Sequence, residues 1–449
     1  MKHKLIITIL TLIFLPHIII AQENNEALNL SVNEAMEYAL QNNTDVQNAQ
    51  LDVIIADKKV WETTTIGLPQ ISASGSYYNN LSLATQLIPA EFFGGEAGEF
   101  AEVQFGTKHN FNGTLTVSQL IFSGSYIVGL QAAKVYRSLS EKTLNKTEID
   151  TKADVASTYY TILMAEETIV TLQSNFDYLQ DLYNQTKAMA EAGFIESIEA
   201  DKLKVTLGSL ENSVKQMERQ IEFLYALLKL QIGTDKETRV ELTDNLNDIL
   251  LNIDVDALFK KEFILEEHAD YQLMVVQEEL MALDLKRYKS EYLPTLSAFY
   301  NFKEDAYRDE FNPFDGSEKW FESSMLGFQI DIPIFNSGEK RSKVQQARLE
   351  LEKSTNTKEY VGSSLYTSLI QTRSDFITNQ EIMVNTRENM EVSKKVLDEI
   401  SIKHKEGMAS SFDLTQANSD YLTTISDYTQ AVVNLLNAKI ELEKILNEI

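Results

Sequence analysis

Two segments of the chain alternate between apolar and polar residues, and each directly follows a Leu-Pro pair. The first covers residues 70–80, after Leu68-Pro69, and the second covers residues 295–303, after Leu293-Pro294. A period of two places apolar side chains on one face of a strand and polar side chains on the other. Each segment has a partner of similar pattern, at residues 112–122 and 324–335, so we expect four amphipathic strands in two pairs.

The rest of the pattern predicts helices of unusual length. Only six prolines and seventeen glycines occur in 449 residues, and most lie within 67–129 or 294–338, so helix breakers are rare elsewhere. Residues 125–191 alone would form a helix of about 100 Å. Apolar residues there step by four and three, the spacing of a coiled-coil seam. We therefore expect two long antiparallel helical hairpins, with turns near Gly193 and Gly407.

The same order of elements occurs twice. Residues 45–69 resemble residues 270–294 at an offset of 225, and later motifs recur at an offset of about 214, in keeping with duplicated units. We divide the chain into a first repeat, 22–245, and a second repeat, 246–449. Residues 232–262 join the two copies.

Several smaller features refine this picture. Ser31 and Glu34 have the spacing of a capping box at the start of the first helical segment. Trp61 lies on the helix that follows, and we expect it in the core. The stretch between the first two strands is rich in Gly and Glu and predicts an exposed loop, as do residues 303–323 in the second copy.

Composition limits the location and the chemistry of the protein. Residues 1–21 have two lysines followed by an apolar run, the pattern of a secretory signal peptide. The net charge is -27, so nucleic acid is not an expected partner, because phosphate binding needs clustered cations. The absence of cysteine excludes disulfides and thiolate sites. We expect no cofactor, no metal site and no enzymatic activity, because no catalytic motif is present and His109, His268 and His404 lack ligand spacing.

Four strands cannot close a barrel, and open strand edges are not tolerated in hydrocarbon. Several chains must therefore combine if the strands cross a membrane. Two chains would give eight strands, the smallest bacterial barrel, and three would give twelve strands and a wider lumen.

At this level of detail the chain resembles the TolC-type outer-membrane efflux proteins. The resemblance covers residues 30–449 and rests on the duplicated order of helix, Leu-Pro, strand, loop, strand and long hairpin, together with the segment Ile330-Asp331-Ile332-Pro333-Ile334-Phe335-Asn336-Ser337-Gly338. It implies an internally duplicated α+β membrane protein in the outer membrane. Long coiled-coil hairpins would form a periplasmic α-barrel tunnel, and four strands per chain would contribute to a trimeric twelve-stranded β-barrel.

The resemblance also implies a function and partners. The homotrimer would be the passive exit duct of an efflux or secretion system, docked by a periplasmic adaptor that is tied to an inner-membrane transporter. Outer-membrane lipid would surround the barrel. An alternative class, a soluble extracytoplasmic coiled-coil interaction protein, explains the hairpins and the charge but not the paired one-sided strands.

Asp413 lies six residues after Gly407, where members of the family place an acidic ring at the tunnel entrance. The other interpretation is helix capping, by Ser411 or by Asp413 itself. A second Asp is common in the family three residues on, but this chain has Gln416 there, which predicts a weaker ring. In the first copy the matching positions are Glu199 and Lys202, for which we favour solvated helix surface.

The two turns resemble the adaptor-docking tips of the family, although any helical hairpin needs such a turn. Their residues are Gly193, Phe194, Ile195, Gly407, Met408 and Ala409. On the strand at 324–335, Gln329 and Asp331 share the polar face, so we expect them in the lumen of a barrel. Five aromatic residues fit either an interfacial girdle of a barrel or ordinary packing: Tyr77, Tyr78, Tyr300, Trp320 and Phe321.

Overall fold

A computed structural model describes residues 27–313 and 315–449 of the chain. The expected signal peptide, residues 1–21, lies outside the described residues. The chain divides into two compact units, each assembled from three segments of the sequence. The sheet unit contains the described residues of 44–153, 255–378 and 438–449. The bundle unit contains residues 27–43 together with Asp154–Asp254 and Asn379–Asn437.

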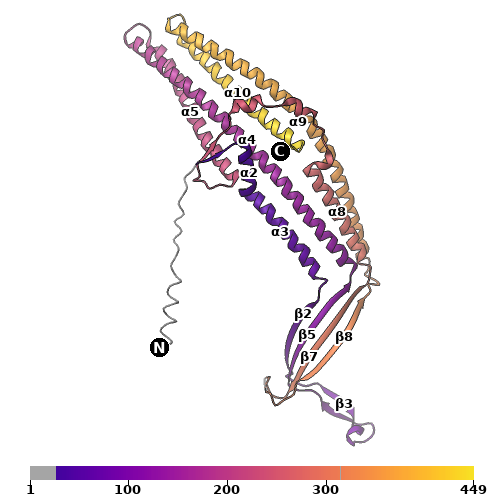
Figure 1. Cartoon of the computed structure of the whole chain (residues 1–449). Helices are drawn as coiled ribbons and strands as arrows, with labels where there is room; N and C mark the ends of the chain where they lie inside the picture. Colours follow the sequence, from indigo (N-terminus) through magenta and orange to yellow (C-terminus); the bar gives the residue numbers. More distant parts are fainter. Residues whose placement is uncertain (1–26, 314) are drawn as a thin grey trace, which may run out of the picture. The chain divides into compact units, whose positions relative to one another are not determined.

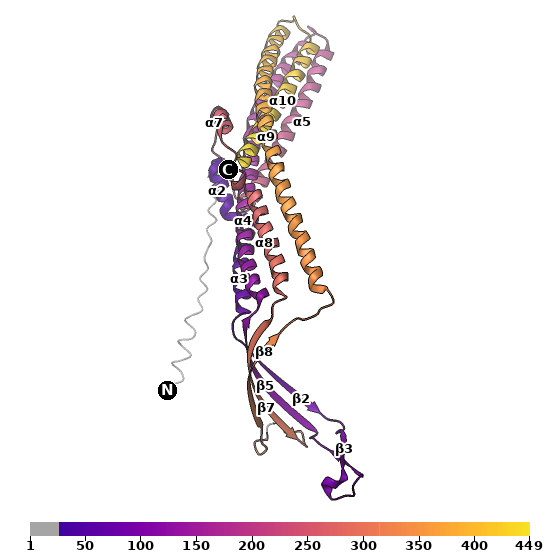
Figure 2. The same cartoon turned by 90° about the vertical axis from the view of Figure 1, so that its right-hand side faces the viewer.

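A four-stranded antiparallel sheet, in the order β2-β5-β7-β8, forms one end of the sheet unit (Figures 1 and 2). Its strands are β2 (Gln70–Asn79), β5 (His109–Phe122), β7 (Thr295–Arg308) and β8 (Phe321–Asp331). The order confirms the four predicted strands and places the first pair beside the second. β2 and β8 are the two edges, each with one row of backbone groups that this sheet does not pair.

The sheet has one apolar and one polar face, as the alternation predicts. The register places Ser74, Thr114 and Lys303 on one face, where Asn112 donates to Asp305 at 2.7 Å and Thr116 donates to Asn301 at 2.8 Å. The opposite face carries exposed apolar side chains: Ile71, Tyr77, Leu115, Tyr300, Leu326, Phe328 and Ile330. Phe311, from the segment that follows β7, packs edge-on against Tyr77 with ring centroids 5.4 Å apart, and the other six of these side chains are exposed.

Four helices continue the strands in the same order. They are α3 (Thr44–Thr65), α4 (Gly124–Glu191), α8 (Ala269–Ser290) and α9 (Glu339–Lys405). Asp57 of α3 pairs with Arg137 of α4 at 2.5 Å, and Lys146 of α4 pairs with Asp270 of α8 at 2.8 Å. Glu278 of α8 pairs with Lys358 of α9. The row therefore runs α3-α4-α8-α9, with α3 and α9 at its edges (Figure 1).

A histidine caps α8 within the sheet unit. The buried His268 accepts a hydrogen bond at Nδ1 from the backbone N–H of Asp270, which requires a neutral imidazole. Burial lowers the pKa of His268, while the nearby Asp270 opposes this shift. Short elements lie around this region: α7 (Val255–Lys260) and η2 (Leu265–Glu267).

The bundle unit is a four-helix bundle built from two antiparallel hairpins. The end of α4 and α5 (Ser197–Ile232) form the first hairpin, and the end of α9 and α10 (Ser411–Ile445) form the second. Leu179, Leu210, Leu397 and Leu414 contribute one residue from each helix to a shared buried core. The coiled-coil seams predicted from the sequence therefore pack within each hairpin and also against the other hairpin.

The base of the bundle unit is closed by a pair of short parallel strands and a helix: β1 (Leu28–Leu30), β6 (Val240–Leu242) and α2 (Val32–Asn42). The capping box of Ser31 and Glu34 is present as predicted. Gly233 ends α5 with φ +73°, and a Cβ added to it would lie 2.1 Å from the carbonyl oxygen of Asn42.

Other details differ from the sequence-based expectations. Trp61 is 60% exposed, so the expectation that it lies in the core is wrong. The loop expected after β2 contains three further elements: β3 (Thr85–Pro89), η1 (Ala90–Phe93) and β4 (Phe100–Gln104). The linker contains β6, α7 and α6 (Leu246–Leu251). β7 runs beyond residue 303 because residues 304–308 find partners on β5. β8 ends before Pro333, which has no N–H to donate.

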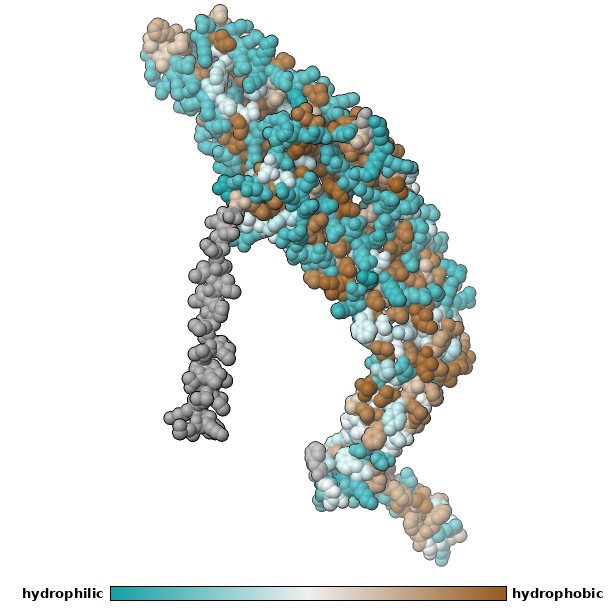
Figure 3. Space-filling view, in the orientation of Figure 1, coloured by the Kyte–Doolittle hydropathy of each residue, from teal (hydrophilic) through white to brown (hydrophobic). Residues whose placement is uncertain are grey.

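None of the described helices has an apolar stretch of the length that crossing a membrane requires. Figure 3 shows where hydrophobic residues gather on the visible face of the sheet unit: along α3 and where the helices meet the sheet.

Candidate functional site

The two hairpin turns of the bundle unit have the same geometry. At the end of α4, Gly193 has φ +81°, its N–H donates to the carbonyl of Ala190, and the N–H of Phe194 donates to that of Met189. At the end of α9, Gly407 has φ +73°, and equivalent bonds run from Gly407 to His404 and from Met408 to Lys403. Glycine adopts positive φ without steric cost, which explains why a glycine stands at each turn.

Glu199 joins the two hairpins at this end of the bundle. Its Oε2 accepts a hydrogen bond of 2.8 Å from the backbone N–H of Ser411, the first residue of α10, and its Oε1 accepts one of 2.8 Å from Lys202. These two bonds, that of Lys202 first, lower the pKa of Glu199 to about 2. The carboxylate is 24% exposed. The interpretation of Glu199 as solvated helix surface is therefore wrong, because it caps a helix of the other hairpin.

His404 makes a second connection between the hairpins. Its Nδ1 lies 3.0 Å from the carbonyl oxygen of Ala409. A carbonyl oxygen can only accept, so Nδ1 carries the hydrogen and donates the hydrogen bond. Its Nε2 lies 3.4 Å from the hydroxyl oxygen of Thr186 on α4. Glu199 and His404 also line a pocket of about 430 Å³ with residues from both turns: Leu182, Gln185, Thr186, Met189, Ile195, Lys405, Gly407, Met408, Ala409 and Ser410.

Polar side chains continue the connection along α4 and α10. Asn175 donates to Asn418 at 2.8 Å, Thr168 lies 3.0 Å from Thr429, and Ser157 donates to Asn437 at 2.6 Å. Asn175 and Asn418 are both buried in the core. Buried polar pairs of this kind fix the register of packed helices, because a shifted register leaves them without partners.

Asp413 is exposed and takes part in a capping box. Its Oδ2 accepts hydrogen bonds from the backbone N–H of Ser410 at 3.0 Å and from the hydroxyl of Ser410 at 2.8 Å, and Ser410 Oγ accepts from the N–H of Asp413. Ser410, rather than Ser411 or Asp413, is thus the N-cap residue. These hydrogen bonds lower the pKa of Asp413.

Gln416 is exposed on the same side of α10 as Asp413 and donates to Asp420 at 2.8 Å. Asp413, Asp420 and Asp427 are all exposed and follow one another at intervals of seven residues. They form an acidic stripe along one side of the helix. Asp420 and Asp427 are not among the residues predicted from the sequence, although their spacing of seven residues from Asp413 is visible there.

The remaining site residues lie where the alternation predicts them relative to the sheet. Gln329 and Asp331 share the polar face of β8, and Gln329 Nε2 lies 3.1 Å from Asp331 Oδ2. They belong to the sheet unit, whereas all the turn residues belong to the bundle unit. Among the described residues, no group of three or more His, Cys, Asp or Glu side chains is placed to hold a metal ion.

Internal duplication, long helical hairpins and an amphipathic sheet are together typical of one class of protein. This class is the channels that combine a helical tunnel with a membrane β-barrel. Residues 35–228 and 284–448 match the family described as outer membrane efflux protein. The chain belongs to this family. It is therefore an outer-membrane efflux channel, and its family is one of ducts rather than enzymes.

Solved structures agree with the fold. The outer membrane channel CmeC of Campylobacter jejuni has a TM-score of 0.72 at 16% identity, covering 93% of this chain and 85% of that one. A membrane protein of Pseudomonas aeruginosa has a TM-score of 0.73 at 14% identity, covering 94% of this chain and 93% of that one. The MtrE channel of Neisseria gonorrhoeae in its open state has a TM-score of 0.66 at 15% identity, covering 92% of this chain and 88% of that one. No curated protein sequence matches the chain.

Proposed function

We propose that three copies of the chain close their sheets into one twelve-stranded barrel, through which exported molecules leave the cell. The observation that carries this proposal is the strand order β2-β5-β7-β8, with unpaired edges at β2 and β8. β2 and β8 run in opposite directions, so β2 of one copy meets β8 of the next as an antiparallel pair and the alternation continues around the ring. The apolar face then contacts lipid and the polar face, with Gln329 and Asp331, lines the lumen.

The size of the lumen favours three copies over two. An eight-stranded barrel has an interior that side chains fill, and the diameter grows with the number of strands, so twelve strands give a wider lumen. An exit duct needs a lumen that side chains do not fill.

The hairpin turns of the bundle unit form the entrance of this duct and the docking site for a periplasmic adaptor. Phe194 and Met408 support this assignment, because they are 79% and 71% exposed on the two turns. Exposed apolar side chains on neighbouring turns favour burial against a partner. The adaptor in turn connects the duct to an inner-membrane transporter.

The acidic stripe on α10 lines the entrance. With three copies, Asp413, Asp420 and Asp427 would form successive rings of three carboxylates. Such rings attract cations and repel anions. Gln416 leaves the first ring with one carboxylate per chain, and Asp420 restores negative charge one heptad further along.

Planar-bilayer recording of the purified protein tests the duct and its entrance. We expect Asp413→Ala to raise the conductance or to weaken block by divalent cations. Loss of the capping bonds to Ser410 should lower the stability of the start of α10 by about 1 kcal/mol, too little to unfold the oligomer. Asp248→Ala is the control, because it removes an exposed carboxylate that lies on α6, outside both turns. An unchanged current and unchanged cation block in Asp413→Ala would remove this residue from the entrance.

Export assays in cells test the docking site. We expect Phe194→Asp and Met408→Asp to abolish export and copurification of an adaptor while the oligomer stays assembled. Full export by both variants would contradict the docking role of the turns.

A further inference from the structure

Three of the four strands carry an exposed aromatic side chain on the polar face of the sheet, near the end that lies away from the helices (Figures 1 and 2). They are Tyr78 on β2, Tyr307 on β7 and Phe321 on β8, and each is between 48% and 60% exposed. The register places all three on one face, because Tyr78 and Tyr307 both lie opposite Asn110, and Phe321 lies opposite Asp305. We call these three side chains the rim aromatics.

The rim aromatics stand out from the rest of their face, which is built mostly of small polar residues: Ser72, Ser74, Ser76, Thr114, Thr116 and Ser323. The aromatic girdles of a barrel face lipid, on the apolar side. Tyr77 and Tyr300 lie on that side, whereas Tyr78 and Phe321 do not. The rings of Tyr307 and Phe321 lie with their centroids 6.0 Å apart and remain about half exposed, so internal packing does not account for them either.

An apolar track leads along the same face toward the rim aromatics. The ring of Phe299 on β7 lies over Gly327 on β8, where an added Cβ would be 2.6 Å from Phe299 Cζ. Met325 is exposed one step further along β8, and Phe321 follows four residues from it, about 13 Å along the strand. An apolar molecule on this face therefore finds successive contacts between the middle of the sheet and its end.

The charges at this end of the sheet have an excess of one sign. On the polar face Lys303 pairs with Asp305 at 2.9 Å, so these two charges balance. The two connections at this end, residues 80–108 and 309–320, contain eight carboxylates and only two lysines. One of the carboxylates, Asp309, is exposed two residues beyond Tyr307. A concentration of negative charge of this kind raises the local concentration of cations.

We propose that the rim aromatics form a binding site for planar aromatic cations inside the lumen of the barrel. This inference rests on the proposed function, because closure of the barrel turns the polar face of the sheet inward. The face of an aromatic ring attracts a cation, and a planar ring system stacks on exposed aromatic side chains. Charge selects the occupant, since the surrounding carboxylates repel an aromatic anion. Three copies bring nine such rings to the exit.

Ethidium is a suitable probe, because it is a planar aromatic cation whose fluorescence rises when it leaves water. It is titrated into the purified oligomer in detergent, and we expect saturable binding. Phe321→Leu keeps an apolar side chain but removes the ring, and it should weaken binding about fivefold, as for the loss of one cation–π contact. Tyr307→Leu should weaken binding by a similar factor, which guards against an effect of one substitution on the fold.

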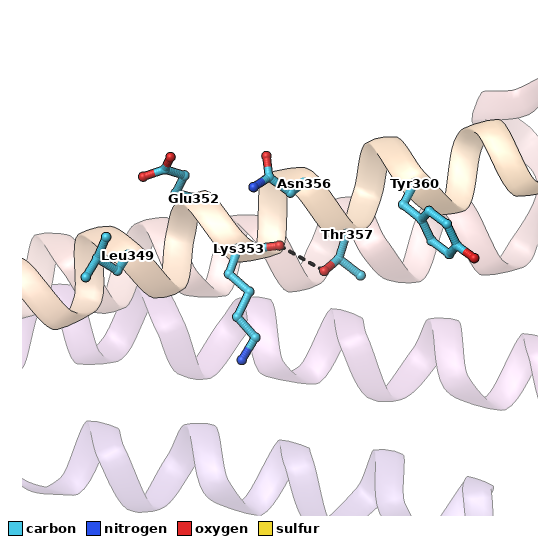
Figure 4. Close-up of a pocket in the computed structure, with 6 residues that line it drawn as sticks. All are labelled: Leu349, Glu352, Lys353, Asn356, Thr357 and Tyr360. Atoms are coloured by element: carbon cyan, nitrogen blue, oxygen red, sulfur yellow. Dashed lines mark hydrogen bonds between the residues drawn. The ribbon is translucent and has the colours of Figure 1, made fainter.

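The matched control is Phe328→Leu, the same substitution on the same strand but on the apolar face. It also reports probe that dissolves in the detergent around that face, and we expect unchanged binding. A second control lies outside the sheet, at a shallow groove of about 400 Å³ on α9 (Figure 4). Tyr360 is the one aromatic residue that lines this groove, and Tyr360→Leu should leave ethidium binding unchanged.

Two further compounds test the chemistry of the site. Tetraethylammonium is a cation without a ring, and fluorescein is an aromatic anion. Neither should displace ethidium at equal concentration. Displacement by tetraethylammonium would show that charge alone holds the probe and would contradict the role of the rings. Displacement by fluorescein would contradict the selection of cations.

Planar-bilayer recording of the same preparations separates this site from the duct. A conducting channel in which Phe321→Leu and Tyr307→Leu bind ethidium as tightly as Phe328→Leu does would overturn the site and leave the duct intact. Absence of conductance in the unmodified protein would overturn both. Binding that is weakened by Phe328→Leu or Tyr360→Leu, and by neither rim substitution, would place the probe elsewhere and contradict the assignment.

Discussion

Removal of the Glu199 carboxylate should release the start of α10 from the first hairpin. In Glu199→Ala the N–H of Ser411 loses its acceptor, and Lys202 loses its ion-pair partner. The side chain of Glu199 is three-quarters buried, so water only partly replaces these bonds. The turn at Gly407 should therefore open more often.

The magnitude follows from two bonds of different strength. A hydrogen bond to a charged acceptor contributes about 1.5–3 kcal/mol, and the partly exposed pair with Lys202 adds less than about 1 kcal/mol. The lowered pKa of Glu199, about 2, agrees in direction, because the bonds from Lys202 and Ser411 both favour the ionised carboxylate. We therefore expect a loss of about 2–3 kcal/mol in Glu199→Ala.

Hydrogen–deuterium exchange with mass spectrometry measures this effect locally. A loss of about 2 kcal/mol should accelerate exchange in the segment 406–416 about thirtyfold. Because the folded pKa of Glu199 is below its unfolded value, its contribution is complete above about pH 4.5 and disappears as the pH falls toward 2. Glu199→Ala should therefore differ from the unmodified protein at pH 7 and lose that difference in strong acid.

Glu196→Ala is the matched control, because it removes a carboxylate of the same hairpin that makes no capping bond. We expect its exchange to equal that of the unmodified protein. Equal exchange of the segment 406–416 in Glu199→Ala and Glu196→Ala would refute the reasoning, since the bond to Ser411 would then contribute nothing measurable.

Three further outcomes follow from the structure. Gly233→Ala should lower the stability of the bundle unit by at least about 2 kcal/mol, measured as a lower thermal midpoint, because the residue has positive φ and its Cβ would clash with Asn42; an unchanged midpoint would contradict this. Burial keeps the folded pKa of His268 below its unfolded value of about 6.5, so the start of α8 should lose stability as the pH falls below that value, seen as faster exchange of residues 266–275 at pH 5; His268→Asn, which keeps a capping side chain, should remove this pH dependence. Gly407→Pro should abolish export while the trimer stays assembled, because proline can neither adopt φ +73° nor donate to His404; export at the normal rate would show that the turn geometry is dispensable.

The local features of this chain were predictable because their causes are local. Alternation after each Leu-Pro pair indicates an amphipathic strand whatever lies beside it, and the capping box of Ser31 and Glu34 depends on residues three positions apart. Gly193 and Gly407 mark the hairpin turns because few other residues adopt positive φ. The duplication then showed that the same elements recur in order.

The contacts of the candidate site were not predictable in this way. Glu199 and Ser411 are 212 residues apart, and nothing in the residues around Glu199 indicates that it caps a helix of the other hairpin. Asp413 was identified, but its partner Ser410 was not. The family pattern indicates only Asp413 and Gln416, whereas the acidic stripe follows from the spacing of seven residues between Asp413, Asp420 and Asp427.

Trp61 shows where the sequence reaches its limit. An apolar stripe on a helix indicates that the stripe will be buried. It does not indicate whether the covering surface belongs to the same chain or to another copy. The sequence by itself determined the strands, the long hairpins and their duplication, because each depends on periodicity and on residues close along the chain. Only the tertiary structure decided the order of the strands, the joining of the hairpins through Glu199 and the two strand edges left unpaired, because these depend on residues brought together from distant parts of the sequence.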